Sequence, residues 1–141
     1  MLATKTRLIH CFTVFLLFFG SIAHAEVVDI DNEALQALLD QGIPIVDIRR
    51  VDEWQDTGVI DKSHLLTFFD KRGNYSSEKW LKSLDSIVKS DEPVIIICRS
   101  GNRSEKVSQW LSEQQGYARV YNVTDGIIDW KDKGGKTVTP E

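Results

Sequence analysis

The chain has 141 residues, 27% of them charged, and a formal net charge of −4. This length suits one compact domain. The net negative charge, with no basic stripe along the sequence, argues against nucleic-acid binding, so we expect no nucleic-acid partner.

Residues 1–25 have the composition of a secretory signal peptide. Lys5 and Arg7 form a basic start, an apolar run follows over residues 11–20, and residues 23–25 (Ala-His-Ala) have the small-x-small form of a cleavage site. The apolar run is shorter than the roughly 20 residues that a membrane-spanning helix needs. An uncleaved membrane anchor is the alternative to a cleaved signal.

Cleavage after Ala25 would leave one domain, residues 26–141, with a net charge of −6. We expect export, to the periplasm, and no membrane attachment after cleavage. Of the two cysteines only Cys98 would remain, so no internal disulfide could form in the oxidising compartment that a signal implies. We expect this lone thiol to be exposed, so oxidation could cross-link two chains, which leaves the oligomeric state open.

Strands and helices alternate along residues 26–141, and this order predicts an α/β domain with a mostly parallel sheet and helices on both faces. The apolar residues 94–97 predict a central strand that is covered on both sides. The predicted strands are residues 27–30, 43–48, 65–69, 94–98 and 117–123. The predicted helices lie between Asp31 and Gly42, over 52–56, from Ser76 or Ser77 through Val88, from the loop after Cys98 to Gly116, and over 127–133.

A cysteine at the end of the most apolar strand is the main chemical signal. The segment Cys98-Arg99-Ser100-Gly101-Asn102-Arg103-Ser104 joins this strand to the start of a predicted helix. Backbone N–H groups at a helix start lack intrahelical acceptors, and in a short loop they can form an anion-binding nest. A thiol in such a nest should ionise readily, and the thiolate is the nucleophile. The alternative is a buried, inert thiol.

Three motifs occur in an order that resembles the rhodanese family of sulfurtransferases. Residues 46–49 (Val-Asp-Ile-Arg), with Glu53-Trp54 and Gly58, resemble the family's early element. Residues 98–104 resemble its active-site loop, and residues 122–134, with Gly126 and Trp130, resemble its closing element. The resemblance is to a single-domain rhodanese, covers residues 26–138, and implies the rhodanese-like α/β fold.

The length of the cysteine loop favours sulfur transfer. The spacing from Cys98 to Arg103 is C-x4-R, as in the sulfurtransferases, whereas related phosphatases have C-x5-R and a wider cradle. The resemblance implies that Cys98 takes a sulfane sulfur from thiosulfate or a persulfide donor, forms a persulfide, and passes the sulfur to cyanide or a thiol. The acceptor could be a protein. The resemblance implies no metal or organic cofactor.

Two other functions stay open. One is a persulfide carrier that serves a protein partner, and the other is a phosphatase or arsenate reductase on the same fold. The carrier would hold a stable persulfide with slow turnover on small acceptors. The six-residue loop argues against the phosphatase and reductase chemistry.

The loop residues have different expected roles. Ser100, Gly101, Asn102, Arg103 and Ser104 would supply backbone N–H groups, with Gly101 allowing unusual dihedral angles. Arg99 either attracts anions at the mouth of the site or is a solvated surface charge.

Charged residues outside the loop are expected to support it. Arg103 either contacts substrate or pairs with Glu53 or Asp47, because a guanidinium suits bidentate carboxylate pairing. By resemblance, Asp47 and Arg49 hold the surroundings of the loop.

The chain departs from the family pattern at two places. Residues 58–63 lack the histidine that many members have, and Asp125 stands where the closing element has its first glycine. His64 lies close to the first departure, and a Cys–His pair of Cys98 with His64 is an alternative to catalysis without a histidine. These departures bear on substrate access and the rim of the site.

Overall fold

The computed structural model describes residues 25–140, and in these residues five strands form one parallel sheet in the order β1-β5-β4-β2-β3. The expected signal peptide lies outside the described residues except for Ala25. The strands are β1 Glu26–Ile30, β2 Ile45–Asp47, β3 His64–Leu65, β4 Val94–Ile97 and β5 Arg119–Val123. The helices are α1 Asn32–Asp40, α2 Val51–Thr57, α3 Ser77–Asp85, α4 Asn102–Gln115 and α5 Gly126–Asp132.

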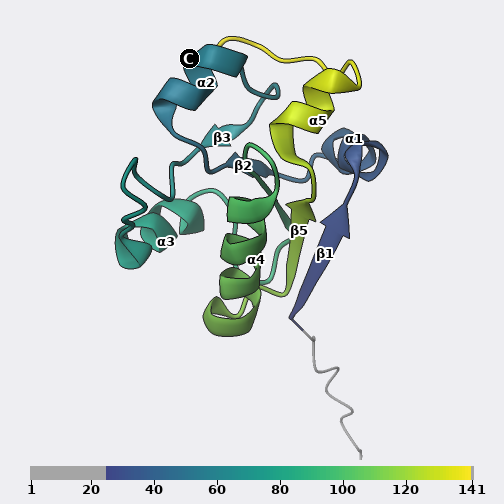
Figure 1. Ribbon diagram of the computed structural model, residues 1–141. Coiled ribbons are helices and arrows are strands. Elements are labelled where there is room, and N and C mark those ends of the chain that lie inside the picture. The colour runs from purple at the N-terminus through teal and green to yellow at the C-terminus, as the bar shows by residue number, and fades with distance from the viewer. Residues whose placement is uncertain (1–24, 141) are drawn as a thin grey trace, which may run out of the picture.

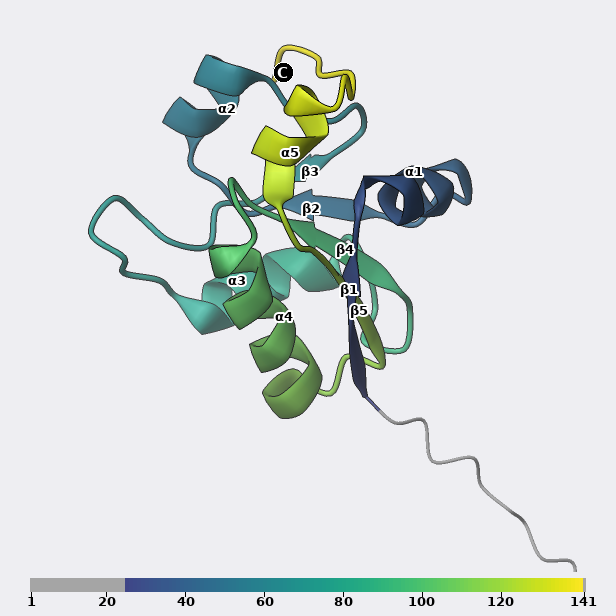
Figure 2. The same cartoon turned by 45° about the vertical axis from the view of Figure 1, so that its right-hand side comes forward.

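Helices cover both faces of the sheet, as the sequence predicted. Helices α3 and α4 pack on one face, and α1 packs on the other together with α5 (Figure 2). Helices α2 and α5 lie at the end of the molecule to which the strands point (Figure 1). The predicted α/β architecture, a parallel sheet with helices on both faces, is therefore confirmed, and the carboxyl edge of the sheet carries two helices that can shape a site.

The central strand β4 decides which face receives Cys98. Val94 and Ile96 pack into the core beneath α3 and α4, whereas Ile95 and Ile97 pack into the core beneath α1 and α5. Successive side chains on a strand alternate between faces. Cys98 continues this alternation and belongs to the core on the α3 and α4 face.

The third predicted strand is shorter than expected. Residues 65–69 were predicted, but β3 is His64–Leu65. The backbone still follows β2 for a few residues, since the N–H groups of Leu66 and Phe68 donate to the carbonyls of Asp47 and Ile48, at 3.0 and 3.2 Å. Regular pairing ends because β2 itself stops at Asp47 and the chain turns into Arg49 and α2.

Helix α3 also ends earlier than the apolar pattern suggested. It stops at Asp85, and the N–H groups of Ile87 and Val88 both donate to the carbonyl of Leu84 in a closing turn. Val88 is buried and Ile87 packs against the same core as Leu84. Apolar spacing therefore marked residues that face the core, some of which lie just beyond the helix.

The C-terminal segment returns across the molecule to α2. After α5 it runs to the far end of α2 (Figure 1), where Val138 and Val59 form an antiparallel bridge, with N–O distances of 3.0 and 2.8 Å. The Lys131 side chain also donates to the carbonyl of Thr57, at 3.0 Å. These contacts tie α5 to α2. Among residues 25–140, no helix combines the length and apolar character needed to cross a membrane.

Candidate active site

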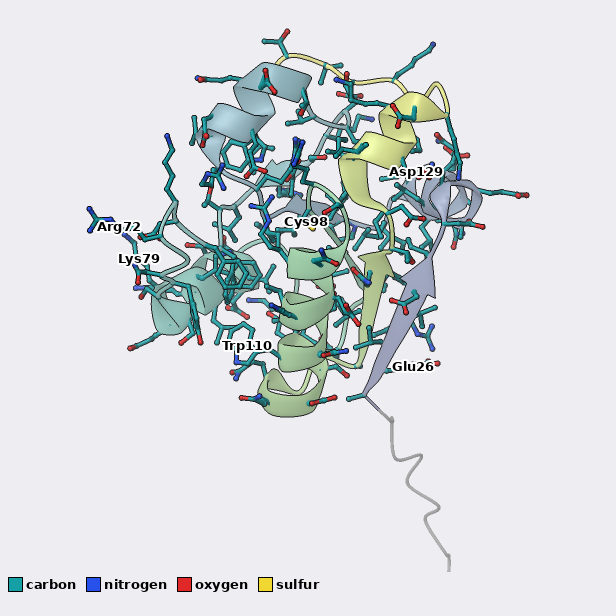
Figure 3. All side chains as sticks on the ribbon, in the orientation of Figure 1. Glu26, Arg72, Lys79, Cys98, Trp110 and Asp129 are labelled. Carbon is teal, nitrogen blue, oxygen red and sulfur yellow. The ribbon has the colours of Figure 1, made fainter. Side chains whose placement is uncertain are left out.

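Cys98 lies between the end of β4 and the first turn of α4. Figure 3 shows it at the top of α4, in the middle of the molecule. The backbone N–H of Ser104 donates to Sγ of Cys98, at 3.4 Å. Asn102, Arg103 and Ser104 are the first residues of α4, where N–H groups have no intrahelical acceptor and the helix dipole is positive. The sulfur therefore sits at a position that stabilises negative charge.

Gly101 gives the loop its sharp turn into α4. Its φ is +90°, and an added Cβ would overlap the carbonyl of Thr124. The Gly101 carbonyl accepts a hydrogen bond from the Ser104 hydroxyl, at 2.9 Å. Any larger residue at position 101 would meet both a strained backbone and the chain end of β5.

The first turn of α5 holds the carbonyl groups of the cysteine loop. The N–H of Ile127 donates to the carbonyl of Cys98 at 3.0 Å, and the N–H of Ile128 donates to that of Arg99 at 3.2 Å. Gly126 allows this approach, because an added Cβ would lie 2.7 Å from the Cys98 oxygen. These hydrogen bonds hold the carbonyls of Cys98 and Arg99 on the side of α5, and the N–H of Ser104 is the group directed at the sulfur.

Arg103 and Glu53 join α4 to α2 across the loop. Nη1 of Arg103 donates to Oε2 of Glu53 at 2.9 Å, and Nη2 donates to Oε1 at 2.6 Å, which makes the pair bidentate. The Arg50 N–H also donates to Glu53 Oε2, at 3.1 Å. The sequence allowed two roles for Arg103, contact with substrate or pairing with Glu53 or Asp47. In the structure Arg103 pairs with Glu53.

The electrostatics of this pair also involve Cys98. Burial acts to raise the pKa of Glu53, but hydrogen bonds from Arg103 and the Arg50 N–H outweigh it, so the pKa lies below its usual 4.5. The hydrogen bond to Glu53 raises the pKa of Arg103 against the effect of burial, and the negative charge of a Cys98 thiolate acts in the same direction. Arg103 is thus held as a cation in its pair with Glu53, close to the cysteine loop.

Asp47 and Arg49 form a buried pair beneath α2. Arg49 is 0% exposed, and its Nε and Nη2 donate to the Asp47 carboxylate at 2.9 and 2.7 Å. Its remaining donors reach the Thr57 hydroxyl and the carbonyls of Glu53 and Gly58, at 2.6, 3.3 and 2.9 Å. Arg49 therefore caps the C-terminal end of α2, and it supports the loop through Glu53 rather than by contact.

Arg99 is exposed and stands among carboxylates. It lines a surface hollow of about 380 Å³ together with Arg50, Asp52, Glu53 and Asp56. Its positive charge can reach a nearby anion, but the neighbouring acids weaken its field. Ser100 and Asn102 are also exposed on the loop.

The expectation of an exposed thiol was wrong. Cys98 is 1% exposed, because it follows the alternation of β4 into the α4 face and the loop closes over it. Burial alone would suit the inert alternative, but the hydrogen bond from Ser104 distinguishes this thiol from an apolar core cysteine. A buried thiol also cannot cross-link two chains without movement of the loop.

His64 and Cys98 are separated by a strand. His64 pairs with Val46 of β2, and Val46 pairs with Ile96 of β4, so β2 lies between the two sites. Two strand spacings place the backbones about 10 Å apart. His64 is exposed, and this arrangement does not form a Cys–His pair.

The motifs in the sequence did not reveal the groups that support the cysteine loop at the ends of α2 and β5 and at the start of α5. Thr57, Thr124 and the N–H groups at the start of α5 carry no chemical signature, and only their tertiary position gives them a role. Asp125 fits its position without strain, since its φ of −105° is open to any residue. The change at position 125 leaves the neighbouring Gly126 in place. Gly126 is the glycine that the close approach of α5 to the cysteine loop requires.

Together these features define a class of protein, an α/β domain with a cysteine in a backbone anion cradle. The family model of the rhodanese-like domain matches residues 31–133, and the chain belongs to this family. It is 30% identical over 102 residues to the thiosulfate sulfurtransferase GlpE of Pseudomonas savastanoi pv. phaseolicola, covering 72% of this chain and 85% of the relative.

Two further comparisons agree with membership of the rhodanese-like family. The chain is 30% identical over 95 residues to the putative sulfur carrier protein YrkF of Bacillus subtilis, covering 67% of this chain and 44% of the relative. A solved rhodanese-like domain protein from Staphylococcus aureus matches with a TM-score of 0.58 and 25% identity, over 79% of this chain and 98% of that one. These relatives support a role in sulfur transfer or sulfur carriage.

Proposed function

We propose that this protein is a sulfurtransferase that moves a sulfane sulfur from thiosulfate or a persulfide donor to a thiol through a persulfide on Cys98. The observation that carries the proposal is the N–H of Ser104 directed at Sγ, in a loop whose carbonyls are bound to α5. Such preorganised donors stabilise negative charge on sulfur at no further reorganisation cost.

The chemistry is a two-step exchange of sulfur bonds. The Cys98 thiolate attacks the outer sulfur of thiosulfate, a new S–S bond forms at Sγ, and sulfite leaves with the electron pair of the broken bond. An acceptor thiolate, or cyanide in an assay, then attacks the outer sulfur of the persulfide. Cys98 leaves as the thiolate and is ready for another cycle.

Intact-mass spectrometry with and without thiosulfate tests this function. We expect a gain of about 32 Da, one sulfur atom, that is lost on addition of cyanide with release of thiocyanate. Cys98→Ser is the matched variant and should show no gain. No gain with thiosulfate or with a persulfide donor would overturn the proposal and favour the oxyanion chemistry of the phosphatase and arsenate-reductase alternative.

A sulfur carrier is the second candidate, and the likeness to the putative sulfur carrier protein YrkF favours it. Such a carrier would hold its persulfide until a particular protein partner accepts the sulfur. The same experiment separates the two functions. A carrier would keep the added sulfur for many minutes in millimolar cyanide, whereas a sulfurtransferase would release it at each turnover.

The proposal includes export to the periplasm, supported by the basic and apolar pattern of residues 1–25. Because β1 begins at Glu26, cleavage after Ala25 would leave the sheet complete. Expression of the full chain in a bacterium with an outer membrane should yield a periplasmic protein that begins at Glu26, as determined by N-terminal sequencing. A cytoplasmic protein that keeps residues 1–25 would contradict export.

A further inference from the structure

A groove with aromatic walls runs along α4 beside the candidate active site. It has a volume of about 260 Å³ and is lined by Phe68, Phe69, Tyr75, Lys106, Val107 and Trp110. In Figure 3, Trp110 lies along α4 from Cys98, on the side of α3. We call this feature the aromatic groove.

The rings of the aromatic groove support one another. Phe68 stacks on Tyr75 with the ring centroids 5.0 Å apart, and it meets Trp110 edge-on at 5.5 Å. Tyr75 is nevertheless 59% exposed, although it is a large side chain. Rigid aromatic residues of this kind dominate the binding energy of protein interfaces, because they offer a large area at a small entropy cost.

A second hollow connects the aromatic groove to the cysteine loop. It has a volume of about 430 Å³, and it shares Phe69 and Lys106 with the groove. Its other lining residues include Arg103 of the loop, Lys71 and Arg50, with Asp70 as the only acid of its lining among the described residues. We call it the basic hollow.

The basic hollow carries positive charge on a chain whose net charge is −4. Arg103 pairs with Glu53, Arg50 pairs with both Glu53 and Asp52, and Lys71 lies 3.8 Å from Asp52. Lys106 makes no ion pair within the described residues, so its charge is available to a partner. Lys106 sits between the aromatic rings and Arg103, where a partner would place its acidic groups.

We propose that the aromatic groove and the basic hollow form a docking surface for an acidic protein partner that brings a thiol to Cys98. The partner would insert an apolar side chain between Tyr75 and Trp110 and place carboxylates against Lys106. This inference rests on the proposed function for the role of the thiol. A protein is favoured over a nucleic acid because Lys106 is the one cation of the basic hollow without an ion pair in the described residues, whereas a phosphate backbone is bound by several unpaired cations.

The spacing along α4 defines a probe peptide. From the first turn of α4 to Trp110 is a distance of about 12 Å, which about four extended residues span. The probe is a fluorescein-labelled peptide of about ten residues with one leucine, one cysteine about four residues away, and aspartate or glutamate elsewhere. A matched peptide carries lysine at every acidic position.

Binding of the probe, measured by fluorescence anisotropy, tests the docking surface without any sulfur chemistry. We expect the acidic peptide to bind at least about tenfold more tightly than the basic one, and added salt to weaken it. Tyr75→Ala and Lys106→Glu should each weaken it by about fivefold or more. Arg119→Glu is the matched charge control, because Arg119 is exposed at the opposite, amino-terminal edge of the sheet.

Three results would overturn the docking surface. They are equal binding of the two peptides, equal effects of Lys106→Glu and Arg119→Glu, and tighter binding of a single-stranded oligonucleotide than of the acidic peptide. The anisotropy result stands even if Cys98 forms no persulfide. If the persulfide forms, Tyr75→Ala should slow sulfur transfer to the peptide thiol and leave transfer to cyanide unchanged, so failure of docking and failure of the proposed function are distinguishable.

Discussion

Replacing Gly126 with alanine tests whether the first turn of α5 shapes the loop around Cys98. Gly126 has a φ of +64°, and an added Cβ would lie 2.5 Å from the Arg99 carbonyl carbon and 2.7 Å from the Cys98 oxygen. The positive φ costs an alanine about 1 kcal/mol, and forcing backbone apart in a packed site adds about 1–3 kcal/mol. We therefore expect Gly126→Ala to lower the free energy of unfolding by about 2–4 kcal/mol.

The same substitution should damage the site. To relieve the overlap, the carbonyls of Cys98 and Arg99 must move away from α5, and the hydrogen bonds from Ile127 and Ile128 would lengthen. A displacement of the cradle by about 1 Å is enough to lower kcat/KM by about a hundredfold. Thiosulfate-dependent sulfur transfer and urea-induced unfolding measure the two effects.

Gly134→Ala is the matched control. Gly134 has a φ of +84°, but an added Cβ there would meet nothing within 4 Å. We expect it to lose about 1 kcal/mol of stability from its backbone alone and to keep the rate of sulfur transfer. If Gly126→Ala and Gly134→Ala lose equal stability and both keep that rate, the proposed role of α5 is refuted.

Two further predictions concern charges near the loop. The lowered pKa of Glu53 means that its ion pair with Arg103 stabilises the fold above about pH 4.5, and that this contribution is lost as the pH falls through the folded-state pKa. Glu53→Gln should thus cost about 1–2 kcal/mol at pH 7 for a partly exposed pair, and this cost should shrink as the pH falls below 4.5, as followed by urea unfolding. A cost that does not change with pH would contradict the pairing. Arg99→Ala should raise KM for thiosulfate, because Arg99 attracts the anion, but only by about two- to fivefold, because nearby acids weaken its field. It should affect KM for a neutral persulfide donor less. Equal effects on both donors would show that Arg99 has no electrostatic role.

The centre of the site could be predicted because its signals are local. The apolar strand, the glycine-containing loop and the helix start occupy consecutive residues, so sequence order alone places Cys98 at a helix N-terminus. The length of the loop from Cys98 to Arg103 is likewise visible in the sequence. These features depend on strand and helix geometry, which neighbouring residues largely determine.

The supports behind Cys98 could not be predicted, and its burial was missed although the sequence held a signal for it. These features depend on how α5 approaches the cysteine loop and on which carboxylate forms an ion pair with which arginine. Arg103 had two candidate partners, and the choice of Glu53 follows only from Arg49 already occupying Asp47. Side-chain alternation in β4 could have indicated that Cys98 faces inward, because Val94 and Ile96 share its face.

The dependence of the cysteine loop on α5 has a consequence for the order in which the protein is made. The chain emerges from the ribosome with Cys98 ahead of Ile127 and Ile128, whose N–H groups hold the loop. Strand β1 must likewise wait for β5, since Glu26 pairs with Arg119. A nascent chain therefore carries Cys98 without a finished cradle, and the cysteine loop is held in place only after residues 126–132 have been synthesised and α5 has docked.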